Sequence, residues 1–393
     1  MAFFPGPLVI VGSGLAGYAL VREFRKLDAQ QQIVMICADS GCQYSKPLLS
    51  CAMSQGKSPE DLVTASAADM ADRMGIIVRN NTRVDAIDPE SHELLIGQER
   101  LRYGKLVLAL GAETVKLPLH DDVKDHVFSV NSLTDYRALR HQLEQETNQP
   151  SKVAIVGGGL VGCELANDVA QSRLAVDLIC ASDQLLPGLI PPEMAELLKQ
   201  KFEQSGIDCH MKRRVENLHQ SSQGLLVELD SGQRLPAHTL ISAIGLKPAT
   251  VLAEVAGLAI GLNGIAVDRY LQTSDPDIYA LGDCAEVDGV SLFYVKPLMA
   301  CARALANTLT QKIERVTYGP MPVNIKTNVM PLLVVAPARN ATEQGAGNWF
   351  VDKKPSGYRA EYRQSNGRLL GYALSDRRMA EQSELNSELP TFF

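Results

Sequence analysis

Two copies of one short pattern constrain the fold of this chain more than any other feature. Each copy has an apolar run, three spaced glycines, a segment with alanine and leucine, and a second apolar run. The first copy comprises PLVIV (7–11), Gly12, Gly14 and Gly17, and IVMICA (33–38). The second comprises KVAIV (152–156), Gly157, Gly159 and Gly162, and LAVDLIC (174–180). Each copy predicts a strand, a glycine turn, a helix and a strand, which is a βαβ unit.

Glycines at this spacing are typical of a loop that binds a dinucleotide pyrophosphate. The first glycine permits the tight turn, the second lets backbone N–H groups approach the pyrophosphate, and the third allows close helix–strand packing. Ser13, Leu15 and Ala16 complete the first loop and are expected at the same site. The pattern therefore predicts two dinucleotide sites.

An acidic residue usually follows the second strand of such a unit and binds ribose hydroxyls. Asp39 is the candidate in the first copy. Asp183 is the candidate in the second, although it is displaced from the usual strand-end position. No Arg or Lys follows the second copy directly, which favours NAD over NADP.

The rest of the chain predicts the domain organisation. After Tyr318, short strand-like runs broken by Pro, Gly and Asn replace the earlier pattern. We predict an α/β fold with two Rossmann-like dinucleotide-binding domains plus a small α+β C-terminal domain. The expected limits are 1–115 and 245–318 for the first domain, 116–244 for the second and 319–393 for the third.

Charge and hydropathy exclude several classes of protein. The formal charge of −7 argues against binding to nucleic acid, which requires a basic surface. No apolar run approaches the ~20 residues that span a bilayer, and no basic residue precedes the first apolar run. We therefore expect neither stable membrane insertion nor a signal peptide. The eight cysteines are scattered without metal-ligand spacing, so we expect no metal site and reduced thiols in the cytoplasm.

Several further motifs resemble one family of enzymes. The runs LALGA (108–112), SAIGLKP (242–248) and TSDPDIYALGD (273–283), with both glycine motifs, resemble the two-dinucleotide-binding-domain flavoprotein reductases related to glutathione reductase. Within that superfamily, the runs YSKPLLS (44–50), DCAE (283–286), VKPLMACAR (295–303) and YGPMPVNIKT (318–327) resemble the rubredoxin–NAD(+) reductases. The resemblance covers nearly the whole chain.

This resemblance implies non-covalent FAD at the first glycine motif and NADH at the second. Gly12, Gly14 and Gly17 would then hold the FAD pyrophosphate. The other FAD positions that it implies are Ala38 and Asp39 near the adenosine ribose, Val84 at the adenine, Asp283 at the ribityl chain, and Val295 and Lys326 near the flavin ring.

Lys46 and Glu164 are the candidate catalytic residues, because the resemblance implies an ion pair between them beside flavin N5. Glu164 follows Gly162 by two positions, which predicts a place in the first turn of the NAD-site helix. A buried carboxylate there requires a cation, and Lys46 is the candidate. Two alternatives stay open: Glu164 as an ordinary carboxylate favoured by the helix dipole, and Lys46 as a surface lysine.

A redox-active thiol is the main competing hypothesis. Disulfide reductases of this superfamily carry C-x-x-x-x-C beside the flavin, whereas the nearest pair here, Cys42 and Cys51, is spaced too widely. Cys51 resembles the single cysteine of NADH oxidases and peroxidases. The alternative is a small core residue one turn into a helix, and the preceding Lys46–Pro47 pair favours the rubredoxin-reductase pattern.

The function implied by the resemblance is transfer of a hydride from NADH to FAD and of single electrons from FAD to rubredoxin. Rubredoxin would in turn supply a membrane alkane hydroxylase. The alternatives are a ferredoxin reductase of an oxygenase system, a single-thiol NADH oxidase or peroxidase that uses Cys51, and a redox-sensing regulator. The basic cluster at 212–214 is either an acceptor contact or a solvated surface.

Overall fold

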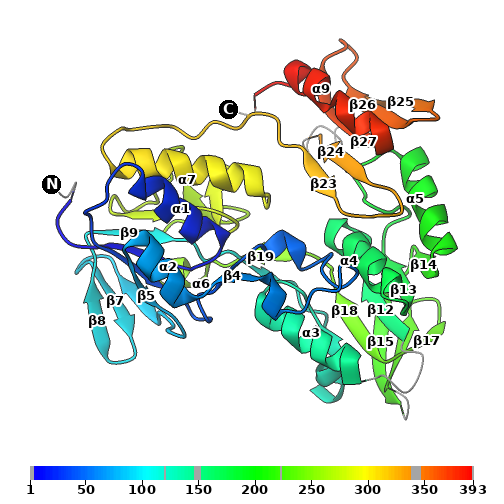
Figure 1. Cartoon of the computed structure of the whole chain (residues 1–393), viewed down its shortest axis with the longest axis horizontal. Coiled ribbons are helices and arrows are strands. Elements are labelled where there is room, and N and C mark those ends of the chain that lie inside the picture. The colour runs from blue at the N-terminus through cyan, green and yellow to red at the C-terminus, as the bar shows by residue number, and fades with distance from the viewer. Residues whose placement is uncertain (1–3, 119–120, 146–151, 222–223, 338–346, 392–393) are drawn as a thin grey trace.

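Three five-stranded sheets organise the chain in the computed structural model, which describes residues 4–118, 121–145, 152–221, 224–337 and 347–391. Two sheets are parallel and the third is antiparallel. Figure 1 shows the first parallel sheet at the N-terminal side of the molecule, and the second parallel sheet beside the antiparallel one. The expected fold class, with two Rossmann-like domains and a smaller C-terminal unit, is confirmed.

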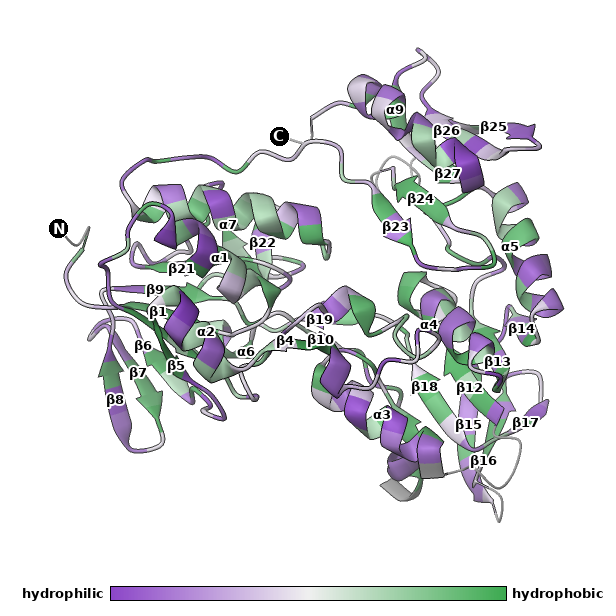
Figure 2. Cartoon of the chain, viewed as in Figure 1, coloured by the Kyte–Doolittle hydropathy of each residue, from purple (hydrophilic) through white to green (hydrophobic). Residues whose placement is uncertain are grey.

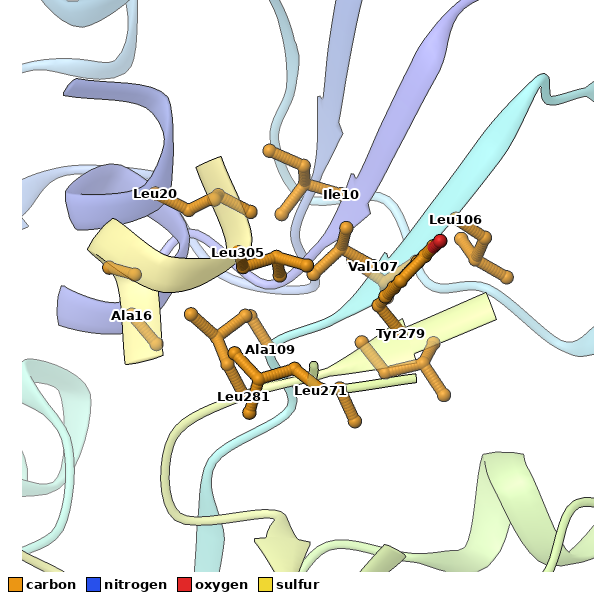
Figure 3. Packing of buried hydrophobic residues seen from close by; sticks show 14 of the residues in the cluster. Ile10, Ala16, Leu20, Leu106, Val107, Ala109, Leu271, Tyr279, Leu281 and Leu305 are labelled. Atoms are coloured by element: carbon orange, nitrogen blue, oxygen red, sulfur yellow. The ribbon is translucent and has the colours of Figure 1, made fainter. Parts of the chain in front are cut away.

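The first parallel sheet has the strand order β21-β9-β1-β2-β5. Its strands are β1 (Leu8–Val11), β2 (Ile33–Ile36), β5 (Ile77–Arg79), β9 (Lys105–Leu108) and β21 (Ile278–Ala280). Helices α1 (Leu15–Arg25) and α7 (Val295–Leu309) lie side by side against it (Figure 1). Figure 3 shows why they stay there: Leu20 and Leu305 pack with Ile10 in one fully buried cluster.

The second parallel sheet repeats this arrangement with the order β11-β18-β12-β13-β14. Its strands are β11 (Val127–Phe128), β12 (Lys152–Val156), β13 (Ala175–Cys180), β14 (Ile207–Met211) and β18 (Thr239–Ser242). The helices α3 (Leu133–Gln145), α4 (Leu160–Gln171) and α5 (Pro192–Gln204) belong to this unit. In Figure 2, β12 and β18 are largely hydrophobic, whereas α3 alternates between polar and apolar positions. This difference is expected because a central parallel strand is covered on both faces.

Smaller sheets and helices complete these two units. The three-stranded antiparallel sheets are β6 (Ala86–Asp88), β7 (Glu93–Ile96) and β8 (Glu99–Arg102), and β15 (Val215–Ser221), β16 (Gly224–Leu229) and β17 (Arg234–Ala237). Other elements are β3 (Gln43–Tyr44), β4 (Val63–Ala65), β20 (Ile265–Val267), β22 (Ala285–Val287), α2 (Ala67–Met74) and α6 (Val251–Val255). Two strands that pair with each other, β10 (Ala112–Thr114) and β19 (Leu246–Pro248), join the units. We propose the domain limits expected from the sequence. In these limits the chain leaves the first domain near residue 115 and returns to it near residue 245.

The C-terminal unit is an antiparallel sheet with the order β23-β24-β27-β26-β25 and a short helix, α9 (Gln382–Glu388). Its strands are β23 (Val323–Ile325), β24 (Leu332–Val335), β25 (Asn348–Lys354), β26 (Gly357–Arg363) and β27 (Leu369–Ser375). Buried residues of this sheet, including Leu332 and Ala360, share one hydrophobic cluster with Leu198 and Phe202 of α5. The second and third units are therefore held together by a common core. Across the described ranges, no helix has the length and apolar character needed to cross a membrane.

This shared core predicts the effect of one substitution. Leu332 is fully buried, and a buried Leu→Ala change costs about 2–5 kcal/mol because a cavity remains. For units of this size, that loss lowers a melting temperature by about 5–15 °C. We expect Leu332→Ala to lower the thermal midpoint reported by the fluorescence of Trp349, the one tryptophan of the sequence. Leu262→Ala is the matched control because Leu262 is 96% exposed; equal midpoints for the two variants would contradict the shared core.

Candidate active site

The first glycine turn has the shape of a pyrophosphate cradle. Gly12 has a φ of +115°, and a Cβ there would lie 2.2 Å from the carbonyl oxygen of Ala109. A Cβ on Gly17 would lie 2.1 Å from the carbonyl oxygen of Gly12, so α1 can approach the turn only with glycine at both positions. At Gly14, which caps α1, a Cβ would meet no atom within 4 Å. The turn is thus tightly packed at Gly12 and Gly17 and open at Gly14, at the N-terminus of α1. An open helix N-terminus fits the pyrophosphate of FAD.

The residues expected around this turn lie next to it. The Ser13 hydroxyl donates a hydrogen bond to Asp39 at 3.2 Å, and the backbone N–H of Gly41 donates to the same oxygen at 3.0 Å. Leu15 and Ala16 begin α1. Ala38 and Asp39 follow β2 and are exposed, whereas Val84 is buried in the hydrophobic core of the first domain. The Asp39 carboxylate is therefore held beside the glycine turn, where ribose hydroxyls can reach it.

Asp283 reaches the same end of α1 from β21. A Cβ on Gly282 would lie 2.9 Å from the Cβ of Ala16, so this loop abuts the first turn of α1. Burial raises the pKa of Asp283, and the nearby Lys46 ammonium opposes that rise. Burial also lowers the pKa of Lys46, with Asp283 and Asp135 acting in the opposite direction. Lys46 and Asp283 therefore interact electrostatically inside the expected FAD site.

The second glycine turn repeats the geometry of the first. Gly157 has a φ of +123°, and a Cβ there would lie 2.3 Å from the carbonyl oxygen of Ala243. A Cβ on Gly162 would lie 1.8 Å from the carbonyl oxygen of Gly157, whereas one on Gly159 would meet nothing within 4 Å. Asp183 lies beyond the end of β13 with 67% of its side chain exposed, 3.9 Å from the Lys212 ammonium. The open side of the turn fits a second dinucleotide, and Asp183 as its ribose ligand stays a prediction.

The Glu164 carboxylate does not have the partner expected from the sequence. It is 1% exposed, and both of its oxygens accept hydrogen bonds from the Lys326 ammonium, at 2.8 and 2.7 Å. The backbone N–H of Lys326 donates at 2.9 Å, and the Ser50 hydroxyl also donates. The expected Lys46–Glu164 ion pair is therefore wrong: Lys326 is the cation that compensates this buried carboxylate. Glu164 is also the fifth residue of α4, beyond the first turn in which we placed it.

Three more polar residues on the same face of α4 escaped the sequence analysis. Asp168 accepts hydrogen bonds from the backbone N–H groups of Met53 and Ser54, at 3.0 and 2.8 Å. Asn167 accepts one from the backbone N–H of Val329 at 3.4 Å, and Gln171 accepts one from the Asn328 amide at 2.9 Å. Their spacing from Glu164 is i+3, i+4 and i+7, which places all four on one helix face. That spacing is visible in the sequence, but the segments they bind are not.

Cys51 lacks the environment of a reactive thiol. It is buried, and burial raises its pKa, while Lys326 opposes that rise. Its nearest polar contacts are the Leu48 carbonyl and the Gln55 amide, both at 3.6 Å. In place of the helix expected to contain Cys51, the structure has a 3-10 turn, Lys46–Leu48, that ends three residues before it. A thiol kept protonated is a poor nucleophile, so the geometry favours a packing role for Cys51.

A groove lies beside the expected flavin position. Its volume is about 320 Å³, and it separates α7 from residues 317–321. Val295, which begins α7, is 43% exposed at one end of it. Lys296 and Arg303 add positive charge to an otherwise largely apolar lining. Within the described part of the chain, no cluster of His, Cys, Asp and Glu is able to hold a metal ion.

Comparisons with known proteins agree with this geometry. A family model described as pyridine nucleotide-disulphide oxidoreductase matches residues 6–316, and one described as rubredoxin binding C-terminal domain matches residues 315–389. A rubredoxin-NAD(+) reductase of Alcanivorax borkumensis is 44% identical over 98% of each chain. One from Acinetobacter baylyi is 41% identical over 94% of this chain and 93% of its own. A nitric oxide reductase FlRd-NAD(+) reductase of Aliivibrio fischeri is 35% identical over 98% and 99%.

Solved structures give the same fold. The putidaredoxin reductase–putidaredoxin complex has a TM-score of 0.87 with 25% identity and covers 98% of this chain and 94% of that chain. A water-forming NADH oxidase of Lactobacillus brevis has a TM-score of 0.84 with 19% identity and covers 98% and 91%. The chain therefore belongs to the pyridine nucleotide-disulphide oxidoreductase family of flavoproteins that use NADH, in the group with a rubredoxin-binding C-terminal domain that includes the rubredoxin–NAD(+) reductases.

Proposed function

We propose that this protein oxidises NADH and delivers single electrons to rubredoxin. One observation carries the proposal: Lys326, which lies in the segment matched by the rubredoxin-binding model, pairs with Glu164 on the helix of the second glycine turn. Ser50, from the segment that follows the first glycine unit, joins the same cluster. Segments of the proposed flavin domain, the proposed donor domain and the unit matched by the rubredoxin-binding model thus meet at one group of side chains.

Residues of the first domain would hold the flavin nucleotide. The open turn at Gly14 and the first N–H groups of α1 would bind the pyrophosphate, Asp39 the adenosine ribose, and Asp283 the ribityl hydroxyls. Lys46 offsets the charge of Asp283 there. Bound FAD supplies the conversion between the two-electron chemistry of a hydride and the one-electron chemistry of an iron centre.

Glu164 and Lys326 have a positioning role in this proposal. Because Glu164 is buried on α4 and Lys326 follows β23, their pair fixes the second glycine turn relative to the C-terminal unit. Ser50 of the first domain donates to the same carboxylate, so the cluster would also fix the second turn relative to the flavin domain and align the nicotinamide of an NADH whose pyrophosphate is bound there. The family resemblance implies that Val295, which begins α7, lies near the flavin ring.

The groove beside α7 supports a docking place for the acceptor. One wall, residues 317–321, belongs to the segment matched by the rubredoxin-binding model. The other wall contributes Lys296 and Arg303, and positive charge raises the association rate with an acidic electron-transfer protein. The groove is also lined by Val295, which is expected near the flavin ring, so electrons would leave there.

We extend the proposal to an alkane hydroxylase as the destination of the electrons, on the strength of the family resemblance. We also propose a cytoplasmic location, which the free state of all eight cysteines supports. A ferredoxin reductase of an oxygenase system is the second candidate, favoured by the fold shared with putidaredoxin reductase.

The acceptor test addresses the proposal directly. With FAD-loaded protein, we expect NADH-dependent reduction of rubredoxin to be faster than reduction of ferredoxin or oxygen, measured by the absorbance of each acceptor. Rapid turnover of oxygen or peroxide with negligible activity toward rubredoxin would overturn the proposal. Faster reduction of ferredoxin would instead establish the second candidate.

The single-thiol hypothesis and the proposed function predict different activities for the Cys51→Ser variant. Because burial raises the pKa of Cys51 and keeps the thiol protonated, we expect Cys51→Ser to retain most of the rubredoxin reductase activity. Cys42→Ser, on the less buried neighbouring thiol, serves as the control. Loss of activity confined to Cys51→Ser would identify a single-thiol enzyme.

The Glu164–Lys326 pair predicts a kinetic effect. Glu164→Gln keeps the shape but removes the charge, which weakens hydrogen bonds worth ~1.5–3 kcal/mol each. We expect the limiting rate of flavin reduction at saturating NADH to fall about tenfold, with a smaller change in NADH affinity. Stopped-flow absorbance separates the two quantities. Glu193→Gln, at an exposed position of α5, should leave both unchanged, and an unaltered limiting rate in Glu164→Gln would remove the positioning role.

A further inference from the structure

The two dinucleotide turns of this chain can be aligned through their backbone hydrogen bonds. The N–H of Gly12 donates to the carbonyl of Ile36 at 2.8 Å, and the N–H of Gly157 donates to that of Ile179 at 2.9 Å. The alignment pairs Cys37 with Cys180, Ala38 with Ala181, and Asp39 with Ser182. Asp183 consequently corresponds to Ser40, one position beyond the acid of the first site.

The neighbouring strand ends align in the same way. In the first domain, the N–H groups of Asn81 and Thr82 donate to the carbonyls of Asp39 and Cys37, at 2.7 and 2.8 Å. In the second domain, those of Lys212 and Arg213 donate to the carbonyls of Ser182 and Cys180, at 3.0 and 2.9 Å. Asn81 and Lys212 also share the left-handed conformation, with φ values of 48° and 54°. Lys212 and Arg213 therefore occupy the places of Asn81 and Thr82.

The alignment shows that the two sites differ in charge beside the glycine turn, where the adenosine ribose is expected. We call this place the ribose corner. At the first site, the Asp39 carboxylate accepts a hydrogen bond from Ser13 in the glycine turn. At the second site, Gly158 replaces that serine, Ser182 replaces the aspartate, and two cations lie beside them. The Cys180 sulfur lies 2.5 Å from where a Cβ of Gly158 would stand, so a serine like Ser13 does not fit at this position. The remaining acid, Asp183, is largely exposed and close to the Lys212 ammonium.

Charge at this corner decides which coenzyme a dinucleotide site accepts. A carboxylate at the place of Asp39 accepts ribose hydroxyls and repels a 2′-phosphate. A hydroxyl with a lysine and an arginine has the opposite preference, because both cations form charge-assisted hydrogen bonds to phosphate oxygens. The Arg213 guanidinium donates to the Lys212 carbonyl at 2.9 Å, and the Lys212 side chain is 70% exposed with its ammonium 3.9 Å from Asp183, the residue after Ser182.

We propose that the second dinucleotide site binds NADPH as well as NADH, and that Lys212, Arg213 and the Ser182 hydroxyl hold the 2′-phosphate. The inference rests on the proposed function in one respect: it concerns the electron donor of that reaction. It differs from the preference for NAD that the strand end alone indicates, because the two cations come from the end of the next strand.

The test measures binding of adenosine fragments to the FAD-loaded full chain by calorimetry. We expect 2′,5′-ADP to bind at least as tightly as 5′-AMP. The double substitution Lys212→Ala and Arg213→Ala should weaken binding of 2′,5′-ADP about tenfold or more and change binding of 5′-AMP by less than about twofold. Lys199→Ala removes a lysine of α5 that pairs with Glu203 at 2.8 Å, and it should change neither affinity.

A second variant installs the acid of the first site. Ser182→Asp should make 2′,5′-ADP bind more weakly than 5′-AMP and should retain binding of 5′-AMP, which also shows that the site is folded. Weaker binding of 2′,5′-ADP than of 5′-AMP by the unmodified protein would overturn the proposal. An unchanged affinity in the double variant would do the same. Because no electron acceptor is present, these outcomes are independent of whether rubredoxin is the acceptor.

Discussion

The buried carboxylate of Glu164 is the interaction on which the arrangement of the three units depends. A carboxylate that is 1% exposed carries a desolvation cost of several kcal/mol unless cations and donors surround it. Here they come from two other parts of the chain: Lys326 after β23 and Ser50 from the first domain. Withdrawal of Lys326 would leave the carboxylate charge unpaired in the interior, and withdrawal of Ser50 would leave one of its hydrogen bonds unmade. Domain placement and electrostatic balance are therefore one requirement.

Two kinds of contact join the units, and they differ in strength and in character. The second and third units share a hydrophobic cluster between α5 and the antiparallel sheet. The first unit meets α4 through hydrogen bonds from 50–54 to Glu164 and Asp168, and its Leu49 and Leu62 share a smaller buried cluster with Tyr136 of α3. Apolar burial resists separation of the units, and the buried carboxylate adds an electrostatic requirement for its donors. The second and third units are therefore joined by a large apolar contact, and the first unit is joined to them by a smaller apolar contact together with the Glu164 and Asp168 hydrogen bonds.

The two glycine turns have the same backbone geometry, although their expected ligands differ. The glycines are the same in both turns because the close approach of backbone carbonyl groups leaves no room for a Cβ at Gly12, Gly17, Gly157 or Gly162. The side chains around the turns differ because they contact the variable part of each ligand. In the proposed assignment, Asp39 beside the first turn and Lys212 beside the second would decide which ligand binds, while the fold decides where it lies.

The sequence by itself determined the elements and the two glycine turns, because strand periodicity and glycine spacing are local properties. Asp39 beside the first turn followed from the same local pattern. The partner of Glu164 did not: Lys46 and Lys326 were both available, and Lys326, 162 residues away, was selected by the docking of the C-terminal unit on α4. The cations beside Ser182 were likewise invisible, since parallel pairing of β13 with β14 brings them there. Local backbone preferences can be read along a chain, whereas charge pairing between distant residues exists only once the sheets and domains have packed.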